Sequence, residues 1–149
     1  MAVSGQRQPH AVHVGRAEHI AALRDHFESV LRAAFSTDVL VANFPAAPAA
    51  RVPNTSNFSF HGVDGEALVI ALDLAGFACS TGSACSSGKV APSHVLEAMG
   101  FGPELAQSAI RISLGWASSE SDIESCLRAW KKLAGNLTKG GRETHAERF

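Results

Sequence analysis

Hydrophobic residues recur along the chain in blocks whose spacing predicts helices and strands. From Arg16 they repeat with a helical period, so one side of a helix is apolar and the other is charged. The apolar side holds Ile20, Leu23, Phe27, Val30, Leu31 and Ala34, and the charged side holds Glu18, Arg24, Asp25, Glu28 and Arg32. This pattern predicts an amphipathic helix that covers a sheet and exposes its charges to water.

The next blocks predict short strands around one further helix. Residues 38–41 are mostly apolar, and residues 57–60 alternate so that both phenylalanines face inward. The proline- and alanine-rich residues 43–53 between them predict a loop. Asp64 can cap a helix that ends near Gly76, and because this helix is apolar nearly all round we expect it to be buried. Residues 77–79 would then form a short strand.

The second half of the chain predicts two short helices, a strand and a long helix. Pro92 and Ser93 can start a helix that ends at Met99, and residues 103–107 can add a turn. Residues 110–114 alternate strictly, with Arg111 pointing away from the core. Residues 119–134 form an amphipathic pattern with Ile123, Leu127 and Trp130 on one side. Few short strands among helices predict a small two-layer α/β sandwich.

Composition limits the classes of protein that this chain can represent. Its 149 residues suffice for one domain with a core, and its net charge of −1 gives no reason to expect a nucleic-acid or membrane partner. We expect residues 1–15 to be poorly ordered, residues 16–136 to form the domain, and residues 137–149 to be a polar tail. No signal peptide is expected, because residues 1–10 are polar. Three cysteines without a Cys-x-x-Cys pair predict neither a disulfide framework nor a zinc site, which favours a cytoplasmic location.

Residues 78–89 carry the most distinctive chemistry. Between Gly82 and Gly88 no side chain is larger than a thiol, which predicts a mobile surface loop rather than a core segment. Cys85 lies in its middle, and no carboxylate occurs from Leu74 to Leu96, so the surroundings favour a reactive thiolate. A solvated glycine–serine turn is the alternative interpretation. The spacing excludes a phosphate loop, because five residues separate the glycines and Val90 stands where a hydroxyl is required.

The remaining candidates have structural alternatives. Arg111 on the outer side of a strand can be merely solvated, although its planar fork also suits a carboxylate. Cys79 follows an apolar segment and Cys126 borders the apolar side of the last helix. Both are therefore expected to pack in the core.

Several motifs, in order and correctly spaced, resemble the cysteine desulfurases of the class V aminotransferase family. They cover roughly residues 17–134, and the serine-rich cysteine loop resembles the NifS/IscS-type branch. The motifs are Val52-Pro53-Asn54-Thr55-Ser56-Asn57-Phe58-Ser59-Phe60, Gly62-Val63-Asp64-Gly65-Glu66, Ser83-Ala84-Cys85-Ser86-Ser87-Gly88, Pro92-Ser93-His94-Val95-Leu96, Met99-Gly100 and Ile110-Arg111-Ile112-Ser113-Leu114-Gly115. The resemblance implies the C-terminal small domain of a fold-type I transferase that depends on pyridoxal 5'-phosphate.

By this resemblance, Cys85 matches the nucleophile that receives sulfur as a persulfide, and Arg111 matches the arginine that grips the carboxylate of L-cysteine. The large domain is missing, together with the lysine that holds the cofactor; Lys89, Lys131, Lys132 and Lys139 do not lie in such a motif. Ala91 also replaces an acidic residue that is frequent in the family. Three interpretations stay open: a C-terminal fragment, one half of a split enzyme, or a remnant with another role. If the enzyme is split, the expected partner is a polypeptide that carries the large domain and the cofactor.

Two functions are compatible with these residues. One is the cysteine-bearing portion of a cysteine desulfurase, which passes sulfur to an acceptor protein for iron–sulfur cluster or thio-cofactor assembly. The other is a non-enzymatic sulfur carrier or protein-binding remnant of that family. Arg111 favours the first, because a pure carrier does not need to hold a carboxylate.

Overall fold

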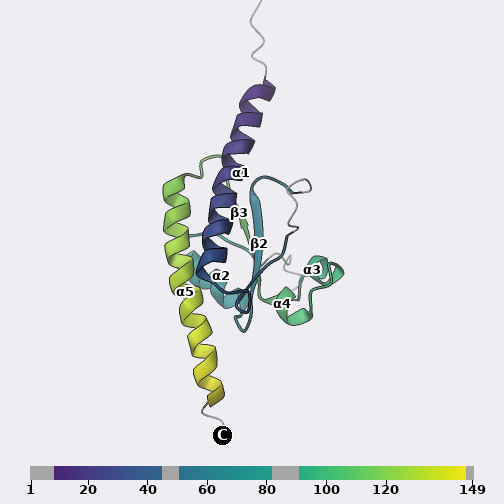
Figure 1. Cartoon of the computed structure of the whole chain (residues 1–149), viewed down its shortest axis with the longest axis vertical. Coiled ribbons are helices and arrows are strands. Elements are labelled where there is room, and N and C mark those ends of the chain that lie inside the picture. Colours follow the sequence, from purple (N-terminus) through teal and green to yellow (C-terminus); the bar gives the residue numbers. More distant parts are fainter. Residues whose placement is uncertain (1–8, 45–50, 82–90, 147–149) are drawn as a thin grey trace, which may run out of the picture.

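The computed structural model describes residues 9–44, 51–81 and 91–146. The elements in chain order are α1 (Pro9–Ala34), β1 (Leu40–Ala42), β2 (Thr55–Phe60), α2 (Gly65–Leu74), α3 (His94–Ala98), α4 (Pro103–Gln107), β3 (Ala109–Ser113) and α5 (Glu120–Ala146). The two long helices, α1 and α5, pack side by side and extend beyond the sheet at opposite ends (Figure 1). Helix α1 begins earlier and α5 ends later than the hydrophobic pattern predicts.

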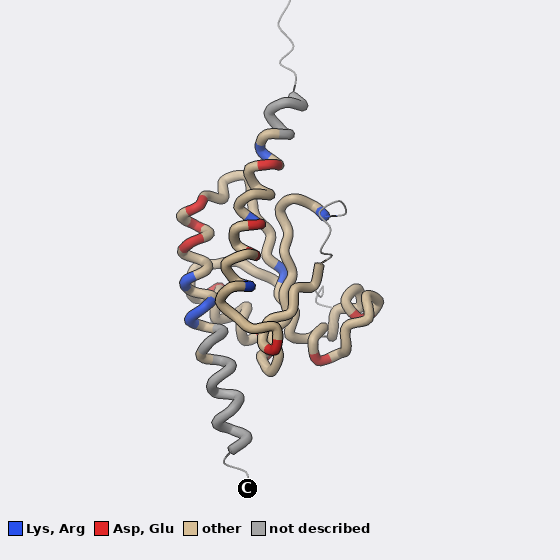
Figure 2. Tube along the Cα trace, in the orientation of Figure 1, with Lys and Arg blue, Asp and Glu red and all other residues tan. Residues whose placement is uncertain are grey.

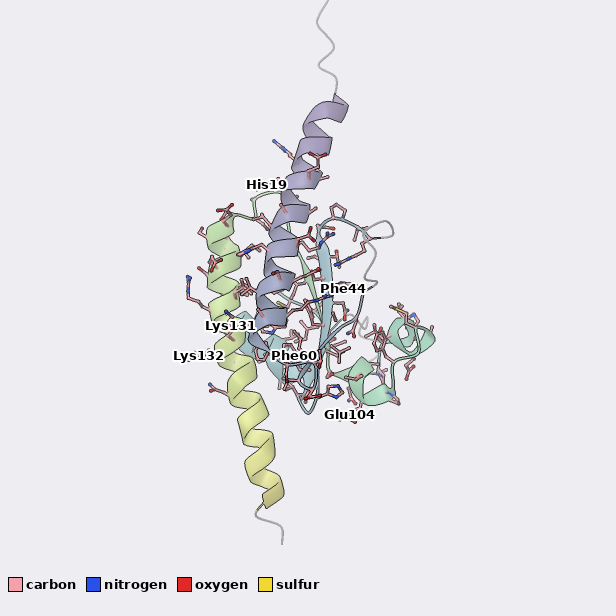
Figure 3. The ribbon with its side chains drawn as sticks, viewed as in Figure 1. His19, Phe44, Phe60, Glu104, Lys131 and Lys132 are labelled. Atoms are coloured by element: carbon pink, nitrogen blue, oxygen red, sulfur yellow. The ribbon has the colours of Figure 1, made fainter. Side chains whose placement is uncertain are left out.

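The strands form one antiparallel sheet in the order β1-β2-β3. One face of the sheet packs on α1 and α5, where Phe58 and Phe60 are fully buried as the alternation predicts. Trp130 of α5 contacts the rings of Phe27 and Phe60, at centroid distances of 5.9 and 5.6 Å. Phe60, the last residue of β2, is labelled in Figure 3. Helices α3 and α4 lie on the other side of β2, away from α1 and α5 (Figure 1). The predicted α/β sandwich is therefore observed.

Local signals place the element ends where the sequence predicts them. The side chain of Asp64 accepts a hydrogen bond from the backbone N–H of Glu66 at the start of α2. Ser93 likewise caps α3 by accepting from the N–H of Leu96. Gly76 adopts a φ of 91°, a left-handed conformation that suits glycine and ends α2.

Two expectations about the middle of the chain are wrong. Helix α2 is only half buried, because Leu68 and Leu72 face the core whereas Ile70 and Leu74 are 54% and 84% exposed. A short helix that packs on β3 and α5 from one side leaves its other side in water, whatever its composition. Residues 77–79 do not form a strand either; the segment pairs with the sheet only at the bridge between Ser80 and Arg111.

The charged side of α1 is also less exposed than its pattern predicts. Arg24 and Glu28 are 8% and 7% exposed, because residues 51–56 pass over this side of the helix on their way into β2. Both terminal nitrogens of the Arg51 guanidinium donate to the Glu28 carboxylate, and the Ser56 hydroxyl donates to it at 2.6 Å. Arg51 also lies 3.9 Å from the ring centroid of Phe44. This buried ion pair fixes the start of β2 to α1.

Charges on α5 are ordered along its axis. Acidic residues stand in its first turn and basic residues follow further on, as the red and blue segments in Figure 2 show. This order complements the helix dipole at the N-terminal end. Across the described ranges, no helix has the length and apolar character needed to cross a bilayer. The same ranges contain no cluster of three or more acidic, histidine or cysteine side chains suited to a metal.

Candidate functional site

A line of polar residues crosses the sheet on the face opposite α1 and α5. The register pairs Asn57 with Arg111, and Ser80 bridges to Arg111 from the other side of β3. Asn43 follows β1 and donates its backbone N–H to the carbonyl of Asn57 at 2.9 Å. Residues that pair directly across antiparallel strands share a face, so these four side chains form one row. We call Asn43, Asn57, Arg111 and Ser80 the polar row.

Arg111 is the exposed cation of this row. Ile110 and Ile112 on either side of it are buried in the core, which holds its backbone and directs its side chain to the opposite face. Within residues 9–44, 51–81 and 91–146, its guanidinium has no ion pair and no hydrogen bond. The predicted placement of Arg111 on the outer side of a strand is confirmed. A fixed backbone with a free planar fork suits recognition of a carboxylate.

Cys85, the other predicted site residue, lies outside the described residues. The segment before it is described up to Thr81, and Ser80 is held to β3 by two hydrogen bonds. The N–H of Ser80 donates to the carbonyl of Arg111 at 3.1 Å, and the N–H of Arg111 donates to the carbonyl of Ser80 at 2.7 Å. Five residues of chain link Ser80 to Cys85, a contour of at most about 17 Å. The described chain is thus anchored to Arg111 at Ser80, five residues before Cys85.

The two other thiols lie on the core side of the sheet. Cys79 and Cys126 line a cavity of about 260 Å³ whose wall also includes Ile112, so neither faces the polar row. Burial raises the pKa of Cys79 from 9.0 to about 11. Burial, reinforced by the nearby Cys79, raises the pKa of Cys126 to about 12. Both cysteines are packing residues with poorly ionised thiols, as the sequence predicts.

The described lysine side chains do not fit a covalently held cofactor near Arg111. Lys131 and Lys132 are exposed on α5 and point away from the sheet (Figure 3). Helix α5 packs on the core face, whereas Arg111 projects from the opposite one. Neither of these two described lysines is therefore placed to hold a pyridoxal phosphate at the polar row.

Sequence reasoning missed the polar neighbours of Arg111. The alternation of residues 57–60 that turns the two phenylalanines inward equally places Asn57 and Ser59 on the face that carries Arg111. Asn43 was assigned to a loop, although it is 5% exposed and hydrogen-bonded to both of these residues. The signal that could have found these neighbours is the polar set of the alternating strand, Asn57 and Ser59.

Comparison with known proteins identifies the family to which the sequence is similar. The family model described as Aminotransferase class-V matches residues 12–126. The cysteine desulfurase IscS of Clostridium botulinum is 44% identical over 91 residues, which are 61% of this chain and 23% of that protein. The cysteine desulfurase NifS of Azotobacter vinelandii is 36% identical over 118 residues, which are 79% of this chain and 28% of that protein.

A solved structure shows the same arrangement of elements. The NifS-like protein from Rickettsia africae superposes with a TM-score of 0.64 at 28% identity, covering 80% of this chain and 29% of that one. The chain thus spans less than a third of the length of these relatives. The family match over residues 12–126 nevertheless includes β2, β3 and all four residues of the polar row. The chain belongs to the class-V aminotransferase family, and its relatives named here are a cysteine desulfurase of the IscS type and others of the NifS type.

Proposed function

We propose that this chain is the cysteine-bearing portion of a cysteine desulfurase. In this proposal Cys85 accepts sulfur from L-cysteine as a persulfide and passes it to an acceptor protein for iron–sulfur cluster or thio-cofactor assembly. The observation that carries the proposal is the bridge between Ser80 and Arg111, which holds the chain five residues before Cys85 beside an exposed cation that has no ion pair within the described ranges. The fork of Arg111 would hold the substrate carboxylate while the tethered thiol reaches the sulfur.

The proposed transfer balances without an added oxidant. The carbon–sulfur bond of L-cysteine breaks, a sulfur–sulfur bond to Cys85 forms, and the carbon skeleton leaves as L-alanine. One thiol proton ends on the carbon and the other on the outer sulfur of the persulfide. The contributions of this chain are a thiolate that can be delivered and a cation that orients the substrate.

A second polypeptide would supply the remaining chemistry. Breaking the carbon–sulfur bond requires an electron sink, which pyridoxal phosphate supplies when it is bound. The lysines of α5 that the structure describes face away from the polar row, and we propose that a large domain outside these 149 residues carries this cofactor. The chain covers 23% and 28% of the length of the IscS and NifS relatives.

The isolated chain is expected neither to bind pyridoxal phosphate stoichiometrically nor to release sulfide from L-cysteine. Visible absorbance after gel filtration with the cofactor, and a sulfide assay, measure the two properties. A yellow complex should form only when a large-domain polypeptide is present, for instance the portion of a matched relative that this chain does not cover. Turnover by the purified chain with added cofactor would contradict the proposal that the cofactor is bound by a large domain outside this chain.

Substitution of Arg111 tests the proposed carboxylate grip in such a restored complex. Arg111→Lys keeps the charge but loses the bidentate fork, so kcat/KM for L-cysteine should fall about ten- to a hundredfold. Arg128→Lys on the exposed side of α5 is the matched control and should leave kcat/KM unchanged. Persulfide formation on Cys85 from a small-molecule sulfur donor should also be unchanged, because this step needs no carboxylate grip.

Full activity of Arg111→Lys would show that Arg111 is only a solvated strand residue. If no large-domain polypeptide restores turnover, but Cys85 still takes up sulfur from a donor, the carrier function is the correct one. An exposed arginine beside Ser80, with no ion pair among the residues that the structure describes, favours the desulfurase.

A further inference from the structure

The polar row contains a second group that can recognise an anion. Asn57 is the direct cross-strand partner of Arg111, and both side chains lie on the face opposite the core. Its carboxamide is partly exposed, whereas Asn43 beside it is buried. Whether Asn57 offers a hydrogen-bond donor or an acceptor therefore depends on whether its side-chain oxygen or its NH₂ group is already bonded.

A chain of hydrogen bonds determines this orientation. The Ser59 hydroxyl lies 2.7 Å from the carbonyl oxygen of Leu105, and because a carbonyl cannot donate, the hydroxyl must. The hydroxyl oxygen is then the acceptor for the amide nitrogen of Asn43, at 2.7 Å. The same nitrogen donates to the side-chain oxygen of Asn57 at 2.8 Å. The carbonyl of Leu105 on α4 accepts only, and it thus fixes the orientation of the Asn43 amide and, through it, of the Asn57 amide.

The result is that Asn57 presents donors only. Its oxygen is engaged by Asn43 on one side, so its NH₂ group is directed away from Asn43, and Arg111 flanks it on the other side. Within the described ranges this NH₂ group donates to no protein acceptor, and neither does the guanidinium of Arg111. The side-chain oxygen of Asn43 is buried and has no hydrogen-bond partner among the described residues, which indicates that the network holds this orientation at a cost.

We infer that Asn57 and Arg111 together bind the carboxylate of an α-amino acid, with Asn43 as a positioning residue that keeps the Asn57 NH₂ group available. This inference rests on the proposed function for the identity of the ligand, but the pairing itself rests on the register and the hydrogen bonds. Arginine supplies charge and a planar fork, and the oriented amide adds a donor at a fixed position. Two donors from neighbouring strands fix both the place and the plane of a carboxylate.

Binding of L-alanine to the full chain tests the inference without any turnover. In nitrogen-15 NMR spectra, L-alanine should shift the side-chain signals of both Asn57 and Arg111, and ethylamine, which lacks the carboxylate, should shift neither. Asn57→Asp keeps the acceptor for Asn43 but removes the donor, so the dissociation constant should rise at least about tenfold. If Asn57 were purely structural, this variant would weaken binding no more than an equal negative charge placed elsewhere near Arg111, since its bond to Asn43 survives.

Ser113→Asp is the matched control for added charge. Ser113 lies two residues along β3 from Arg111 on the same exposed face, so the substitution adds a carboxylate near Arg111 without removing an Asn57 donor. It should weaken L-alanine binding clearly less than Asn57→Asp does. Equal weakening by both variants would mean that charge alone explains the effect, and the inference would fail. Asn57→Ala, which removes the amide without adding charge, should also weaken binding.

The outcomes separate this inference from the proposed function. Shifts at Arg111 without shifts at Asn57 would overturn the role of Asn57 and leave the role of Arg111 intact. No shift at either residue would overturn the paired site. Carboxylate binding at both residues, in a chain that never takes up sulfur on Cys85, would support the site and reject the desulfurase proposal.

Discussion

Cys85 is expected to react with iodoacetamide at neutral pH long before Cys79 and Cys126. The reactive species is the thiolate, and burial raises the pKa values of the other two thiols to about 11 and about 12. Relative to a thiol with the usual value of 9.0, this lowers their thiolate fractions by about a hundredfold and about a thousandfold. Peptide mass spectrometry at successive times after mixing measures the three rates separately.

The pH dependence gives this prediction a definite sign. A raised thiol pKa means that the folded state keeps the proton, so labelling of Cys79 should climb tenfold per pH unit until the pH approaches 11. Unfolding in urea serves as the control, because all three rates should then converge. Equal labelling of the three cysteines in the folded chain would refute the assignment of Cys85 as the reactive thiol.

Glu28→Ala is expected to destabilise the fold by about 3–5 kcal/mol, because it leaves the buried charge of Arg51 without its partner. The side chain of Glu28 is 9% exposed, and its carboxylate is the shared acceptor for Arg51 and Ser56. Urea unfolding, followed by the fluorescence of the buried Trp130, measures the loss. Glu28→Gln, which preserves the shape and one acceptor, should lose less than the alanine variant.

The matched control lies on the other long helix. The Glu124 carboxylate is hydrogen-bonded to the His26 ring across α1 and α5 at 2.8 Å, but both side chains are about half exposed. Exposed pairs are screened by water and contribute little, so Glu124→Ala should leave the urea midpoint almost unchanged. If Glu28→Ala were no more destabilising than Glu124→Ala, the buried network would have no special role in holding β2 to α1.

The sequence by itself determined the elements whose signals are local. A capping side chain acts within one turn, so Asp64 and Ser93 mark the starts of α2 and α3 directly. Strict alternation along a strand assigns each side chain to a face, and for this reason the outward position of Arg111 could be predicted before any contact was known. The spacing of the family motifs likewise depends only on the order of residues in the chain.

The tertiary structure decided everything that depends on which segment covers which surface. Glu28 has the helical position of a solvated residue, and it is buried only because residues 51–56 cross over it. Ile70 and Leu74 have apolar side chains, yet they are exposed because nothing in the described chain packs over that side of α2. No local pattern reveals such long-range coverage.

The polar row combines both kinds of information. Alternation places Asn57 on the face of Arg111, but only the register makes the two residues direct neighbours, and only the bond between Ser59 and Leu105 orients the amide. Register depends on how two distant segments pair, and amide orientation depends on a third segment, α4. The residue types of the candidate site could therefore be predicted from the sequence, whereas their arrangement as a set of donors arises from the folded sheet.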